Sequence, residues 1–93
     1  MATVKVTLGL TDRDVDNANY IYAWTRSRTR AQAVSIALSL TRYLIDQRRT
    51  GARIQIRHEN GTIERIVMTE LENLATPEEA EKALAVLRER SAA

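Results

Sequence analysis

The sequence predicts a mainly α-helical fold with a small amount of β-structure. Three observations predict it: an alternating apolar segment near the start of the chain, three later segments with apolar residues at helical spacing, and a turn signal between two β-prone runs. At 93 residues, the chain is near the size at which a single hydrophobic core is only just sufficient. We therefore expect association with a second copy to supply additional burial.

Charge is unevenly distributed along the chain. Residues 1–57 hold ten Lys or Arg and four Asp, a balance of +6, whereas residues 58–93 hold four Lys or Arg and eight Glu, a balance of −4. Twelve of the 14 cations are arginine, whose planar guanidinium suits bidentate contacts with phosphate and guanine. This asymmetry indicates that residues 1–57 bind an anionic partner. The alternative is that their charges form an ordinary solvated surface.

The composition also excludes several classes of site. With no cysteine and one histidine (His58), the chain has neither a disulfide framework nor a thiolate or multi-histidine metal site. No apolar run reaches the roughly 18 residues of a membrane span, and the N-terminus lacks a signal-peptide pattern. We expect a soluble, cytoplasmic protein with no membrane partner and no cofactor.

The segment TVKVTLGL, residues 3–10, alternates apolar and polar positions as a half-buried strand does. A lone short strand cannot satisfy its own backbone groups, so we expect it to pair with the same strand of a second chain around a two-fold axis. Lys5, Thr7 and Gly9 would then face outward from a two-stranded ribbon, which fits the major groove of B-DNA. The positions facing the helices of both chains would be Val4, Val6, Leu8 and Leu10.

Two helices are predicted after the strand. The first covers residues 12–25, with Thr11 as its N-cap. A polar run at residues 26–28 breaks the pattern, and Thr29 and Gln32 then match the capping box that starts the second helix. Its apolar face carries Val34 and Leu38, which we expect in the dimer core, and Gly51 is its stop signal. The later arginines of this helix are expected on a solvated face and end: Arg42, Arg48 and Arg49.

The rest of the chain predicts a β-hairpin and a third helix. Residues 53–68 contain two β-prone runs around Glu59-Asn60-Gly61, and Asn-Gly is a strong hairpin-turn signal, although the pattern leaves the register open. Residues 69–75 are expected as a connector. Thr76-Pro77-Glu78-Glu79 combines an N-cap, a first-turn proline and a capping box, and predicts a helix from 77 to about 90.

TVKVTLGLTDRDV, then RSRTRAQAV, then a helix ending QRRTG, resembles the ribbon-helix-helix DNA-binding proteins, which include repressors and many antitoxins. The resemblance covers about residues 3–51. It implies an intertwined homodimer whose paired strands enter the major groove and whose second helix presents its N-terminal amides to a phosphate. By position, it assigns base contacts to Lys5, Thr7 and Gly9, and phosphate contacts to Arg28, Thr29 and Arg30.

Two positions depart from the family pattern. Relatives usually carry a hydrogen-bonding side chain at the third outward position, where this chain has Gly9. The glycine either removes one base reader or lets the ribbon approach the groove floor more closely, and the sequence leaves both readings open. The turn between the helices in relatives often begins with glycine, which adopts the left-handed conformation cheaply, whereas this chain has Arg26.

The resemblance implies a sequence-specific regulator of transcription, a repressor or autoregulator, that binds double-stranded DNA at a pseudo-palindromic operator and acts in association with the nucleoid. Residues 1–51 would dimerise and bind DNA, as a dimer or a higher oligomer, and residues 52–93 would form an accessory or oligomerisation extension. One alternative is an antitoxin whose residues 52–93 bind and neutralise a toxin. Another is a plasmid partition or conjugation accessory factor.

The residues offer little support for catalysis. The carboxylates cluster in the first turns of predicted helices, where capping and the helix dipole account for them. No serine has a histidine positioned to activate it, and the chain has no glycine-rich phosphate loop. We expect no enzymatic activity and no metal site.

Overall fold

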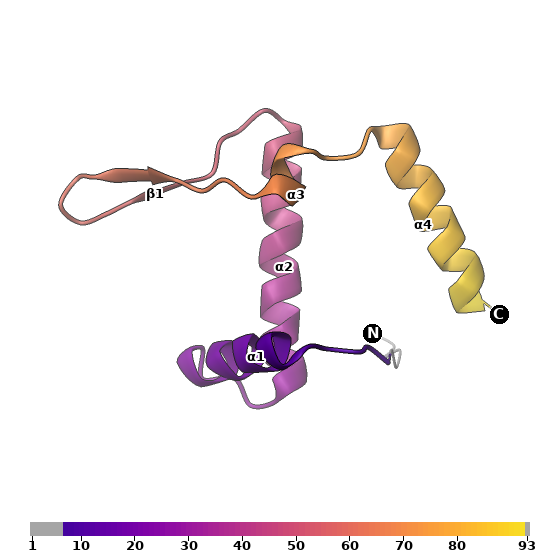
Figure 1. Cartoon of the computed structure of the whole chain (residues 1–93), viewed down its shortest axis with the longest axis horizontal. Helices are drawn as coiled ribbons and strands as arrows, with labels where there is room; N and C mark the ends of the chain where they lie inside the picture. Colours follow the sequence, from indigo (N-terminus) through magenta and orange to yellow (C-terminus); the bar gives the residue numbers. More distant parts are fainter. Residues whose placement is uncertain (1–6, 93) are drawn as a thin grey trace. The chain divides into compact units, whose positions relative to one another are not determined.

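A computed structural model describes residues 7–92 of the chain (Figure 1). The fold is mainly helical with one two-stranded antiparallel sheet, which confirms the predicted class. A short helix, α3, lies where the sequence predicted a connector. The elements in chain order are α1 (Asp12–Trp24), α2 (Arg30–Arg49), β1 (Gln55–Arg57), β2 (Ile63–Arg65), α3 (Thr69–Glu72) and α4 (Pro77–Ala92).

The chain divides into two compact units, one ending at Arg42 and the other beginning at Tyr43. This division falls within α2, whereas the sequence placed a boundary after residue 51. The C-terminal turns of α2 belong with the second unit because Arg48 bonds to Ala52, Leu71 and Glu72.

Thr11 caps α1 as predicted. Its hydroxyl accepts a hydrogen bond from the Asp14 amide at 3.1 Å, and the Asp14 carboxylate accepts one from the Thr11 amide at 3.4 Å. Two N–H groups that lack a partner within the helix are thereby satisfied by a threonine and a carboxylate three residues apart. In the first unit, α1 crosses the N-terminal part of α2 (Figure 1).

Arg26 ends α1 in the conformation that glycine commonly supplies. Its φ is +54°, and its amide bonds to the Ala23 carbonyl at 3.5 Å while the Ser27 amide bonds to the Tyr22 carbonyl at 3.1 Å. These two bonds make a Schellman C-cap with an arginine at its left-handed position. The absence of glycine at this position therefore does not prevent the turn.

Both ends of α2 follow the sequence signals, with one difference at the start. Thr29 Oγ1 accepts from the Gln32 amide at 3.0 Å, but the Gln32 side chain accepts from the Arg28 amide at 2.8 Å instead of from Thr29. At the other end Gly51 has a φ of +91°, and its amide bonds to the Arg48 carbonyl at 3.0 Å. Gly51 is therefore the helix stop that the sequence predicted.

The hairpin register, which the sequence left open, pairs Ile56 with Glu64 and flanks that pair with Gln55–Arg65 and Arg57–Ile63. The loop is a three-residue type. The Gly61 amide bonds to the His58 carbonyl at 2.9 Å, the His58 amide bonds to the Thr62 carbonyl at 2.8 Å, and Gly61 takes a φ of +91°. The glycine of the Asn-Gly signal thus supplies the left-handed residue that this loop requires.

The segment predicted as the N-terminal strand lies only in part within the described residues. Val4, Lys5 and Val6 lie outside the described residues. Residues 7–11 form neither a helix nor a strand in the part of the chain that the structure describes. Pairing with a second copy, and the intertwined dimer, therefore stay predictions.

Very little apolar surface is buried within this one chain. Across residues 7–90, Ala33 and Leu71 are the buried apolar side chains. Large apolar side chains stay exposed on every long helix, with exposed fractions up to 74% for Trp24. Among the helices of residues 7–92, none is long and apolar enough to cross a membrane.

Candidate nucleic-acid interface

The N-terminal end of α2 carries three of the predicted site residues: Arg28, Thr29 and Arg30, all exposed. Thr29 satisfies the Gln32 amide, as described above. The amides of Arg30 and Ala31 donate no hydrogen bond within residues 7–92. Such amides, together with the helix dipole, form the usual protein site for a phosphate or another anion.

The charge at this end of α2 differs from that at α1 and α4. The first turns of α1 and α4 contain two carboxylates each, and a carboxylate completes each capping box through Asp14 and Glu79. The first turn of α2 contains none, and its cap is completed by the neutral Gln32. Within residues 7–90, Arg28 and Arg30 form no ion pair. No carboxylate in this first turn therefore neutralises the positive end of the α2 dipole.

An open apolar groove of about 200 Å³ lies in the first unit. It brings together four of the six predicted dimer-core residues, Leu8 and Leu10 from the N-terminal segment and Val34 and Leu38 from α2. Leu8 and Leu38 are about two-thirds exposed. The remaining lining residues are Asp14, Asn17, Ala18 and Ile21 of α1 and Ala37 of α2.

Of the three predicted base-contacting residues, Thr7 and Gly9 are described and exposed, and Lys5 lies outside the described residues. Gly9 has an ordinary backbone conformation for any residue, because its φ is not positive. A Cβ added there would meet no atom within 4 Å. Nothing within the described chain therefore requires glycine at this position.

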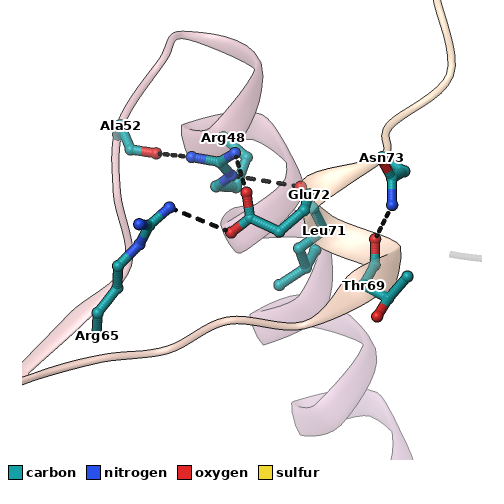
Figure 2. Close-up of polar contacts among 7 residues, drawn as sticks. All are labelled: Arg48, Ala52, Arg65, Thr69, Leu71, Glu72 and Asn73. Carbon is teal, nitrogen blue, oxygen red and sulfur yellow. Dashed lines mark hydrogen bonds and ion pairs between the residues drawn. The ribbon is translucent and has the colours of Figure 1, made fainter.

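Arg48 was predicted on a solvated helix end, and this prediction is wrong. Its guanidinium bonds to the Ala52 carbonyl at 2.9 Å, the Leu71 carbonyl at 3.3 Å and the Glu72 carboxylate at 2.9 Å (Figure 2). Arg65 approaches the other oxygen of Glu72 at 3.6 Å. The cluster ties the end of α2 to the hairpin and to α3. The Arg48–Glu72 partners are 24 residues apart, so no local pattern could have indicated them.

Comparison of the chain with protein-family models, with curated proteins and with solved structures finds no match in any of the three. Function is therefore inferred from the residues and their geometry.

Proposed function

We propose that the protein is a homodimeric, sequence-specific double-stranded DNA-binding regulator of transcription. The observation that carries this proposal is the N-terminal end of α2, which is exposed, has no carboxylate in its first turn and stands between Arg28 and Arg30. Arginines next to free helix amides suit a backbone phosphate. Contacts of this kind position a protein on the duplex without reading its sequence.

The homodimer is supported by the apolar groove of the first unit. Leu8, Leu10, Val34 and Leu38 line it, and each is exposed in the single chain. An exposed apolar surface of this kind marks an interaction site. The N-terminal segment also needs a strand partner, and a second copy related by a two-fold axis supplies both the apolar cover and the backbone pairing.

Base reading is assigned to the outward face of the paired N-terminal segments. Lysine pairs best with guanine, and threonine can donate, accept or contact a thymine methyl group. Lys5 and Thr7 from both copies would read the two halves of the site. Because the two-fold axis of the protein is matched by the DNA, the operator is a pseudo-palindrome.

In vitro selection from random duplex DNA tests the proposal. At about 150 mM salt, where non-specific binding is weakened, we expect enrichment of an inverted repeat. Binding without enrichment would remove the base-reading role from Lys5 and Thr7. The absence of any binding would overturn the proposal and favour a protein partner for residues 52–93.

Substitution of Arg30 by alanine tests the phosphate contact. We expect Arg30→Ala to weaken binding to all sequences alike and to reduce the salt-dependence slope by about two per dimer, because one phosphate contact is lost per copy. Arg42→Ala is the matched control, because Arg42 lies on the same helix about 18 Å further along. Equal losses in the two variants, measured by fluorescence anisotropy across salt concentrations, would contradict the assignment.

A further inference from the structure

An apolar stripe runs along α4 and is only partly covered within the described chain. At 100° per residue, Ala80, Ala83, Leu84 and Leu87 fall on one side of the helix. Leu84 is 45% exposed and Leu87 is 56% exposed. Part of the stripe borders an open groove of about 310 Å³ within the second unit, whose lining includes Ile45, Leu74, Ala80 and Leu84.

The charges that border this stripe have an ordered pattern. Glu81 and Arg88 lie on one flank, seven residues apart, and Glu79 and Arg90 lie on the other flank. On each flank the carboxylate comes first and the arginine later. None of these four side chains forms an ion pair within residues 7–90.

We propose that α4 packs antiparallel against α4 of a second copy around a two-fold axis near Leu84. Reversing one helix places its Arg88 opposite Glu81 of the other copy, and its Arg90 opposite Glu79. The position numbers of both pairs have the same sum, 169, so a single axis position satisfies both flanks at once. Glu79 already accepts the Thr76 amide at 3.0 Å, so the Glu81–Arg88 pair is the cleaner one to test.

The apolar residues of the stripe fit the same arrangement. With this axis, Leu84 meets Leu84 of the second copy at the centre, and Leu87 lies opposite the small residues Ala80 and Ala83. Large side chains thereby face small ones on both sides of the axis, as close packing requires. A parallel pair would instead bring opposite flanks together and set Glu81 near Glu79 of the second copy and Arg88 near its Arg90. Charge complementarity therefore selects a second copy in the antiparallel orientation.

This self-association goes beyond the proposed function. It uses unit Tyr43–Ala93 and not the groove of the first unit, so it supplies a second contact between copies of the chain. Its existence does not depend on DNA. If DNA binding fails and α4 pairing is found, only the proposed function falls; the reverse result removes only this inference.

Charge exchange tests the pairing in the full-length protein. Glu81→Arg and Arg88→Glu should each raise the dissociation constant of the contact between the two α4 helices about tenfold, because two symmetric attractions become repulsions. The double variant Glu81→Arg/Arg88→Glu should return to within about threefold of the wild type. Residues seven positions apart do not pair along one helix, so this rescue requires a second helix. Failure of the double variant to recover, in sedimentation velocity without DNA, would overturn the proposal.

A matched pair of apolar substitutions provides a second measurement. Val86 is 46% exposed, as Leu84 nearly is, but it lies on α4 away from the stripe. We expect Leu84→Gln to weaken self-association on the order of a hundredfold or more, and Val86→Gln to leave it unchanged. Circular dichroism checks that both variants stay helical. The proposal would be overturned if the two substitutions had equal effects or if the wild type were monomeric. It would also be overturned if the protein captured other proteins without associating with itself.

Discussion

At the residue scale, Arg26 carries a backbone cost that a glycine would avoid. Its φ of +54° lies in the left-handed region, where an L-residue with a side chain is disfavoured by about 1 kcal/mol or more. The two C-cap hydrogen bonds hold it there. The turn between α1 and α2 is therefore formed against a local preference.

We predict that Arg26→Gly raises the free energy of unfolding by about 0.5–1 kcal/mol, because glycine adopts a positive φ without the steric penalty. Chemical denaturation would measure the gain. Arg26→Ala separates the backbone effect from the loss of charge, since alanine keeps the penalty. An equal gain in both variants would assign the effect to charge.

Gly9 presents the opposite case, a glycine that nothing in the described part of the chain requires. Its φ is not positive, and a Cβ there would meet no atom within 4 Å. We predict that Gly9→Ala leaves the unfolding free energy within about 0.5 kcal/mol of the wild type and weakens DNA binding about tenfold, because the methyl group would hold the ribbon off the groove floor.

Thermal unfolding and DNA titration of the same Gly9→Ala sample separate the two effects. Unchanged DNA affinity would instead favour the other reading, in which Gly9 simply lacks a base-reading side chain.

At the element scale, the helix caps show how short-range contacts define α1, α2 and α4. Each N-cap is a threonine whose hydroxyl accepts the amide three residues later: Thr11 from Asp14, Thr29 from Gln32, and Thr76 from Glu79. The cap of α4 also contains a titratable group, the carboxylate of Glu79. Hydrogen bonds from the backbone and side chain of Thr76 hold the pKa of Glu79 below its ordinary value of 4.5.

This shift predicts a pH dependence with a definite sign. Because the folded pKa is lowered, the carboxylate stabilises the start of α4 fully above pH 4.5, and the contribution is lost as the pH falls through the folded pKa. We expect the Thr76 amide resonance and the first turn of α4 to change below pH 4.5. Glu79→Gln should remove this change, whereas Glu78→Gln, outside the cap bonds, should retain it. A wild-type resonance that stays constant down to pH 2 would contradict the prediction.

Arg48 connects elements that the sequence pattern treats as separate. Its bonds to two carbonyls and one carboxylate join the end of α2, the start of the hairpin and α3 (Figure 2). The ion pair between Arg48 and Glu72 is partly buried, with side-chain exposures of 18% for Arg48 and 27% for Glu72. This cluster gives the second unit an internal connection of its own, although its apolar core is small.

At the scale of the whole molecule, stability should depend on association. Ala33 and Leu71 are the buried apolar residues among 7–90, and that burial is small for a chain of this length. A protein that folds fully only when paired has a melting temperature that rises with its concentration. We expect this rise across a hundredfold range of concentration.

A substitution of Leu38 tests whether the groove is the surface that associates. Leu38 is 66% exposed in the single chain, so Leu38→Asn would cost little stability in a monomer. If Leu38 is buried in a dimer, the same substitution would lower the free energy of unfolding by about 2–3 kcal/mol per copy. Leu38→Met keeps the apolar volume and should stay near the wild type. Calorimetry at several concentrations measures both, and a melting temperature independent of concentration would contradict the dimer.

Much of the local structure was determined by the sequence alone. The bounds of α1, the caps at Thr11 and Thr29, the stop at Gly51, the hairpin and the start of α4 were all predicted. The caps and the stop depend on contacts between residues at most five positions apart, and the hairpin was indicated by its Asn-Gly turn, so each leaves a readable pattern. The proposed phosphate site at the start of α2 could be assigned for the same reason, because capping and the dipole act within one turn.

Only the tertiary structure decided the features that depend on distant residues. The hairpin register pairs residues up to ten positions apart, and the role of Arg48 followed from a carboxylate 24 positions away. The convergence of Leu8, Leu10, Val34 and Leu38 on one groove required the N-terminal segment, α1 and α2 to be placed together. A local pattern gives the face on which a side chain lies, but folding determines which faces find cover and which stay open to a partner.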